Sequence, residues 1–145
     1  MEYRKYGDTY YVRMDRGDEI IENILDVCKN ENISSCTFSG IGGCKKAEIQ
    51  TYIPEIGTFE TTVLEGMLEL VSLTGNIISD AGNGLFHHTH AVFSYKADNQ
   101  HEFAAGHIKS IVVSYTAEIT LKPVMDGTIK RQHDPETGTG FWKFE

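Results

Sequence analysis

The chain has 145 residues, of which 40% are hydrophobic and 23% are charged, and its formal net charge is −8. This composition excludes a disordered chain and a modular multidomain protein, so we expect a single domain over residues 1–145. The acidic charge has the wrong sign for direct nucleic-acid binding, and the basic residues fall in isolated pairs such as Lys45-Lys46 rather than in a stripe interleaved with aromatic residues.

No membrane or export segment is visible in the sequence. There is no run of about 18 apolar residues, and the start, Met1 to Lys5, lacks the apolar stretch of a secretory signal. We therefore expect a cytoplasmic protein with no membrane partner. Three cysteines, Cys28, Cys36 and Cys44, match no C-x-x-C metal or redox spacing, so we expect them to be reduced and Cys28 to lie in the core.

The clearest periodic segment is a predicted helix over residues 18–30. Apolar residues recur there at helical spacing, with acidic and amide residues between them. They are Ile20, Ile21, Ile24, Leu25, Val27 and Cys28. Acidic residues at the start of the segment and Lys29 at its end complement the helix dipole. We expect this helix to cover one face of a sheet.

The other segments alternate with a period close to two and are rich in Val, Ile, Thr, Tyr and Phe, which is typical of strands. Predicted strands span residues 9–14, 34–39, 45–52, 58–64, 67–74, 87–96 and 111–121. Glycines at residues 40–43 indicate a bulge or tight turn, residues 80–84 a loop that could rim a pocket, and residues 134–138 a turn between two short terminal strands. The pattern predicts an α+β domain with one main helix and a mostly antiparallel sheet of about seven strands.

A sheet with one helix leaves its second face to be explained. A large apolar sheet face in water invites association, so this face must close into a barrel, carry function or meet another subunit.

Three histidines cluster in a predicted strand, and they are the first candidates for chemistry. His88 and His90 are two residues apart and therefore share a face, with Cα atoms roughly 6.5 Å apart. Imidazoles at that separation can converge on one zinc ion. A third ligand is needed, and His107 is the best candidate because a turn near residues 98–100 brings the chain back alongside. His101 could compete, but it lies close to that turn.

The alternative explanation of the H-x-H pattern is a cross-strand ring pair on a solvated sheet face, and the sequence leaves both interpretations open. If the three histidines do bind a metal, we expect a catalytic type of site, since structural zinc sites usually have four protein ligands. The fourth position would then take solvent or a small molecule.

Glu69 is the second candidate residue. Met67, Val71 and Leu73 are expected to share its strand face, and a carboxylate among apolar side chains is either paired or functional. A salt bridge or an inverted assignment of the face would account for it without function. If Glu69 reaches the metal site, it could orient a histidine, accept a proton from bound water or ligate the ion.

Read in order, four motifs resemble the PPC domain, the "plants and prokaryotes conserved" family, whose members often carry a DNA-binding label. The motifs are Ser39-Gly40-Ile41-Gly42, Glu69-Leu70-Val71-Ser72-Leu73-Thr74-Gly75, His88-Thr89-His90 and Ala105-Gly106-His107. The resemblance covers residues 9–144. It implies an α+β domain that assembles as a homotrimer and, in the prokaryotic branch, a zinc-type site.

Carried over position by position, the resemblance implies that His88, His90 and His107 are the ligands of zinc or a similar divalent metal. Ala105-Gly106-His107-Ile108 stands where the family more often shows Gly-Gly-His-Leu, which keeps the ligand in place. Glu69 matches the family's acidic position and is our candidate catalytic residue. The domain is also similar in fold to acetolactate decarboxylase, which holds zinc by histidines.

Plant members of the family add an AT-hook, a segment centred on Arg-Gly-Arg, and no Arg-Gly-Arg occurs here. A trimer would carry a formal charge of −24, three times that of one chain, which would repel DNA. The leading hypothesis is therefore a homotrimeric protein with a three-histidine metal site that binds or transforms a small molecule. The alternatives are a regulatory module that acts with DNA or a DNA-binding partner, and purely structural metal binding.

Overall fold

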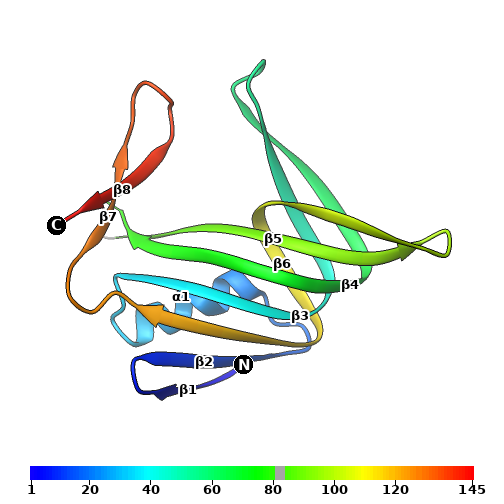
Figure 1. Ribbon diagram of the computed structural model, residues 1–145, viewed down its shortest axis with the longest axis horizontal. Helices are drawn as coiled ribbons and strands as arrows, with labels where there is room; N and C mark the ends of the chain where they lie inside the picture. Colours follow the sequence, from blue (N-terminus) through cyan, green and yellow to red (C-terminus); the bar gives the residue numbers. More distant parts are fainter. Residues whose placement is uncertain (81–83) are drawn as a thin grey trace.

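The computed structural model describes residues 1–80 and 84–145, and these form eight strands and one helix (Figure 1). In chain order the elements are β1 (Glu2–Tyr6), β2 (Thr9–Asp15), α1 (Ile20–Asn30), β3 (Ser35–Ile53), β4 (Thr58–Ser79), β5 (Leu85–Ala97), β6 (Gln100–Pro123), β7 (Ile129–His133) and β8 (Gly140–Phe144). All but one of the strand pairings are antiparallel. The predicted α+β class is confirmed, with one strand more than the seven expected.

Helix α1 begins where Glu19 caps it. The Glu19 carboxylate accepts a hydrogen bond from the Glu22 backbone N–H at 2.6 Å, which satisfies one of the free donors of the first turn. Asn32 adopts a left-handed conformation with φ 55° just after the helix, as its end requires. One stripe of the helix is buried against the sheet, as predicted: Ile20, Ile21, Ile24, Val27 and Cys28.

Four long strands, β3 to β6, form a closed ring of pairings. Strand β3 pairs with β4 and β6, and β5 pairs with the same two strands. The segments predicted at residues 34–39 and 45–52 form one strand, β3, which begins at Ser35, and residues 58–64 and 67–74 belong to β4. The break predicted in β3 was wrong because Gly40 and Gly42 form a β-bulge, one of the two predicted alternatives, where the register shifts but the strand continues. The break predicted in β4 was wrong too, and it lies opposite a second register shift, between Cys44 and Lys46. A Cβ atom at Gly42 would lie 2.7 Å from the Ala117 Cβ, so only glycine allows β3 and β6 to approach this closely.

The core lies between α1 and one face of the ring. Along β2, Tyr10, Val12 and Met14 are buried, while Tyr11 and Arg13 between them are exposed. This alternation assigns one sheet face to the core and leaves the other to solvent. The three cysteines are free and Cys28 belongs to the core, as predicted, and Cys36 and Cys44 are buried as well.

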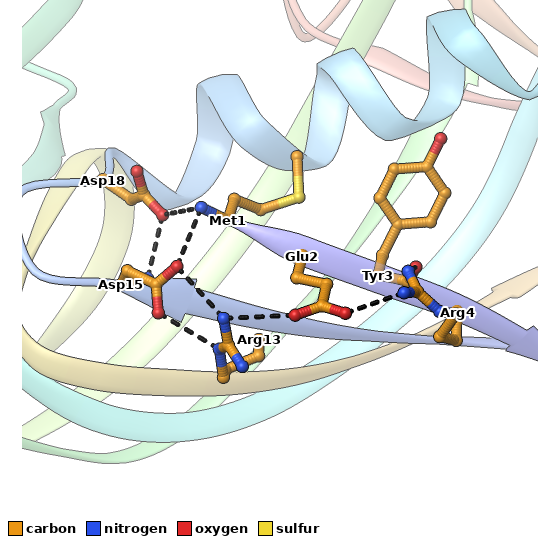
Figure 2. A network of polar contacts seen from close by, with 7 residues as sticks. All are labelled: Met1, Glu2, Tyr3, Arg4, Arg13, Asp15 and Asp18. Atoms are coloured by element: carbon orange, nitrogen blue, oxygen red, sulfur yellow. Dashed lines mark hydrogen bonds and ion pairs between the residues drawn. The ribbon is translucent and has the colours of Figure 1, made fainter.

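Strand β1 was not predicted, and it adds an edge to β2. Figure 2 shows the polar network that joins the two strands and the loop before α1. The Met1 ammonium lies 2.9 Å from Asp18 and 3.1 Å from Asp15, and Arg13 pairs with both Asp15 and Glu2. Glu2, Arg13 and Asp15 are about half exposed, so the ion pairs among them contribute little to stability.

The β7–β8 hairpin follows at the end of the chain, as predicted. Its turn is closed by Asp134, whose carboxylate accepts hydrogen bonds from the Glu136 backbone N–H and the Thr137 hydroxyl. The Trp142 indole N–H donates to the Asn76 side chain at 3.4 Å, which joins the hairpin to β4. The predicted loop at residues 80–84 includes residues 81–83, which lie outside the described part of the chain. In that part, no helix has the length and apolar character needed to cross a membrane.

Candidate metal centre

His88 and His90 lie on β5 and are both exposed on the sheet face that α1 leaves free. His90 pairs across the sheet with Thr74, which pairs with Ser39, which pairs with Thr120. All of these residues are exposed, so they mark the same open face. The side chain of Thr89, between the two histidines, is fully buried. The prediction that His88 and His90 share a face is therefore confirmed.

His107 is the direct cross-strand partner of His90 in the β5–β6 pair. The chain reverses between these strands at Asp98 and Asn99, whose φ angles of 47° and 64° are those of a tight hairpin turn. The predicted turn and the return of the chain as a neighbouring strand are both present. His101 lies on the same strand, nearer the turn, and its ring contacts Ser94 at 3.5 Å.

The three histidines converge. One ring nitrogen from each of His88, His90 and His107 lies within 4.8 Å of the other two, and the ring centroids are 5.2 to 5.4 Å apart. The Nε2 atoms of His88 and His90 are 3.3 Å apart. Two imidazole nitrogens bound to a tetrahedral zinc at about 2.0–2.1 Å would be about 3.3–3.4 Å apart. The donor set and its spacing therefore fit a zinc-type ion.

The electrostatics of the cluster favour the neutral form of His88 and His107. Burial, followed by the nearby charges of His88 and His90, lowers the pKa of His107 to about 4. Burial and the neighbouring His90 also lower the pKa of His88. Neutral imidazole is the form that binds a metal ion, so the lowered pKa values of His88 and His107 favour their ligating form at neutral pH.

Two hollows border the cluster. A cavity of about 400 Å³ is lined by His88 and His107, together with residues of β3, the β4 start and the β7–β8 hairpin. A second hollow of about 300 Å³ is lined by His88, His90 and Trp142, among others. The Phe59 ring stacks on His107 with centroids 5.5 Å apart and limits the orientation of that imidazole. A ligand bound to an ion at the cluster would have space beside it.

Glu69 lies elsewhere on β4. It pairs with Ser94 on β5, four residues along that strand from His90. Its side chain is exposed and borders a different hollow, with Met67 and Val71 nearby. The prediction that Leu73 shares this face was wrong: Leu73 is 1% exposed, because the register shift between Leu70 and Ser72 reverses the alternation.

Sequence reasoning did not select two residues beside the cluster, Phe59 and Arg131. Phe59 lies near the start of β4 and Arg131 lies on β7. Both line the cavity because distant strands pair, which the sequence alone does not reveal. In the sequence Arg131 is the second member of an ordinary Lys-Arg pair, and no local signal distinguishes it.

The comparisons with known proteins show the family of the chain. The family model described as the Plants and Prokaryotes Conserved (PCC) domain, also abbreviated PPC, matches residues 1–125. The chain belongs to this family. Among curated proteins, none matches the chain.

Solved structures of PPC proteins share the fold over nearly the whole chain. A PPC protein from Pyrococcus horikoshii is 27% identical with a TM-score of 0.84, covering 98% of this chain and 94% of its own. The metal-containing protein AF0104 from Archaeoglobus fulgidus is 26% identical with a TM-score of 0.83, covering 98% and 96%. A candidate DNA-binding protein from Bacteroides thetaiotaomicron is 24% identical with a TM-score of 0.88, covering 99% and 96%.

The expected similarity in fold to an enzyme is also present. The α-acetolactate decarboxylase of Bacillus subtilis has a TM-score of 0.55 and 15% identity, covering 79% of this chain and 52% of its own. At this identity the similarity concerns the fold alone.

Proposed function

We propose that this PPC-domain protein binds zinc or a similar divalent ion through His88, His90 and His107 and that the bound ion receives a small molecule. The observation that carries this proposal is the convergence of three imidazole nitrogens within 4.8 Å from two neighbouring strands. The metal-containing relative from Archaeoglobus fulgidus supports it. Three ligands leave a fourth position free, which is the arrangement of catalytic zinc sites.

The protein's own residues would each contribute to such a site. A bound zinc ion would polarise a ligand's oxygen or lower the pKa of a bound water. His88 and His90 would hold the ion at the open sheet face, and His107 would fix its position from β6. Phe59, stacked on His107, would keep that ring in place and exclude water from one side of it.

Metal content of the untagged protein tests the proposal. We expect about one equivalent of a divalent metal in the wild type and a loss of most of it in His107→Ala, measured by elemental mass spectrometry with circular dichroism to monitor folding. His101→Ala is the matched control, since His101 lies on the same strand outside the cluster, and it should keep its metal.

Two outcomes would contradict the proposal. A wild-type protein with less than about a tenth of an equivalent, and with unchanged stability in chelator, would remove the metal site. Unfolding of the protein on chelation would instead favour a structural role for the ion, because a site with an open position should not hold the core together.

We also propose that the chain assembles as a homotrimer through the sheet face opposite α1. Large apolar side chains cluster there around one hollow: Ile41 is 57% exposed, Met67 47%, Val71 50% and Tyr115 72%. Contiguous apolar surface of this kind marks an interaction site. Its closure by copies of the chain would remove this surface from water.

Glu69 borders the same hollow, and we propose a catalytic role for it only in the assembled protein. Within one chain it lies along the strand from the cluster, so a second chain would have to bring it to a metal centre. Glu69→Gln should then retain its metal and lose activity or ligand affinity. Loss of metal in this variant would indicate a ligand instead.

A DNA-associated regulatory role is the second candidate, and the names of several structural relatives favour it. The net charge of −8 opposes direct binding, because phosphate contacts supply most of the affinity in such complexes. We expect no electrophoretic shift of DNA at physiological salt. Tight binding with a steep salt dependence would overturn this expectation.

A further inference from the structure

Arg131 on β7 borders the same cavity as His88 and His107. Its guanidinium lies over the Phe86 ring, 4.2 Å from the centroid, and the residue is only partly exposed. Such stacking fixes the plane of the guanidinium and so the direction of its N–H groups.

The Nε atom of Arg131 is buried and has no hydrogen-bond partner in the described part of the protein. Nor does any carboxylate there lie within ion-pair distance of this side chain. A buried donor left without an acceptor is destabilising, and buried charges in proteins are normally paired. The Nε atom is enclosed by the protein, so a ligand would bind the terminal N–H groups of the guanidinium, which are not buried.

The charge of the cavity points to the same conclusion. The protein has a net charge of −8, yet the described residues that line this cavity include two cations and no acidic residue. Lys109, one of the cations, is paired with Glu48 at 2.8 Å. Arg131 is therefore the uncompensated charge, and the cavity favours an anion.

Gly140 on β8 makes room for the arginine. A Cβ atom at Gly140 would lie 2.9 Å from the Arg131 Cγ and 3.0 Å from its Cζ, and it would also overlap Nε. Any larger residue would push the guanidinium away from Phe86. Gly140 thus acts as a positioning residue for Arg131.

We propose that Arg131 binds the carboxylate of a small ligand that occupies this cavity. The inference rests on the proposed function, since a second oxygen of the ligand would face the ion held by His88 and His107. The planar guanidinium offers parallel N–H donors that match the two oxygens of a carboxylate. Arg131 lies beyond residue 125, where the family match ends, so that match assigns it no role.

Calorimetric titration with malonate tests the subsite, with neutral malonamide and inorganic phosphate as comparison probes. The titrations use zinc-loaded wild type, Arg131→Gln and Gly140→Ala. Lys130→Gln is the control, because it removes the same charge one residue away. We expect malonate to bind the wild type and the control with the same affinity. It should bind Arg131→Gln at least about tenfold more weakly, and malonamide should bind none of the proteins. Gly140→Ala should also weaken malonate binding. Metal content should be the same in all four proteins.

The outcomes separate this inference from the proposed function. Equal malonate affinity of wild type and Arg131→Gln, no malonate binding to the wild type, or a preference for phosphate would overturn the carboxylate subsite even if the metal is present. If the wild type binds no metal, the proposed function fails and malonate is titrated into the metal-free protein. Weaker malonate binding to metal-free Arg131→Gln than to metal-free wild type would still support the subsite, and equal binding would overturn it.

Discussion

Gly75 on β4 decides how closely the histidine strand can approach. It pairs with Thr89, between His88 and His90, and a Cβ atom at this position would lie 2.6 Å from the His88 carbonyl oxygen and 2.5 Å from the Phe38 ring. Neither neighbour can yield easily, because one is backbone and the other is a buried ring. The glycine therefore fixes the spacing of β4 and β5 at the cluster.

Gly75→Ala should lower the free energy of unfolding by about 1–3 kcal/mol, the usual cost of overpacking, and should weaken metal binding. Denaturant unfolding and metal content measure the two effects. Gly84→Ala is the control, since a Cβ atom at Gly84 meets no described atom within 4 Å. An alanine variant at residue 75 with wild-type stability and metal content would contradict this account.

Part of the site could be predicted from local sequence patterns, and part could not. The H-x-H spacing and the turn before His107 are local patterns, and they indicated that the three histidines could meet, while a cross-strand ring pair stayed open as the alternative. Gly106 allows β6 to lie close to β3, because a Cβ atom there would lie 2.8 Å from the Ile49 side chain. Phe59 and Arg131 could not be predicted, since their places beside the cluster depend on pairings between distant strands.

At the level of single elements, α1 is joined to the sheet by Glu19. One of its carboxylate oxygens accepts from the Glu22 N–H in the helix, and the other accepts from the Ile111 N–H on β6 at 2.7 Å. Burial is the largest influence on this group and raises its pKa, although the two hydrogen bonds oppose that shift. A single carboxylate thus caps the helix and fixes its position against β6.

Glu19→Ala should lower the unfolding free energy by about 1–2 kcal/mol through loss of the cap and a buried N–H left without a partner. The pH dependence has a defined sign. Because the pKa of Glu19 is raised in the folded state, the folded chain holds the proton more tightly, and stability falls as pH rises from the unfolded value through the folded one.

Glu19→Gln should remove this fall, as measured by denaturant unfolding between about pH 4.5 and 7. Glu102→Gln, at an exposed carboxylate nine residues along β6 from Ile111, removes the same charge and is the control for the change in net charge. An unchanged slope in Glu19→Gln would show that the cap does not titrate as described.

Element prediction succeeded where the pattern was local. The helix needed only its apolar spacing, and the terminal hairpin needed only its turn residues. The break predicted within β3 was wrong because the glycines at residues 40–43 look the same in the sequence whether the chain bulges or turns, and the break predicted in β4 was wrong at the second register shift, opposite Cys44 and Lys46. Strand β1 was missed because only one of its residues, Tyr3, is partly buried, so no alternating apolar pattern marks it. The segment is a strand because it pairs with β2.

At the scale of the whole molecule, the open sheet face combines the histidine cluster with exposed apolar side chains. In Figure 1, the β3–β4 and β5–β6 hairpins extend away from the part of the sheet that α1 covers. An assembly through this face would bury the apolar hollow and enclose the edges of the cluster.

Val71→Glu should disrupt the proposed trimer, because it places a charge in the apolar hollow next to Glu69. In sedimentation velocity, the wild type should run at three times the 16.2 kDa mass of one chain and the variant at a smaller mass. Ser34→Glu, in the exposed segment after α1, adds the same charge and should remain trimeric. A wild type that stays monomeric at about 100 µM would contradict the assembly.

The coordination of the bound ion is the most direct test of the whole account. X-ray absorption at the zinc edge of the loaded protein should detect three imidazole nitrogens at about 2.0–2.1 Å and one further light atom from solvent or an added small ligand. A shell containing sulfur at about 2.3 Å, or one with fewer than three imidazoles, would contradict a metal centre built from residues 88, 90 and 107.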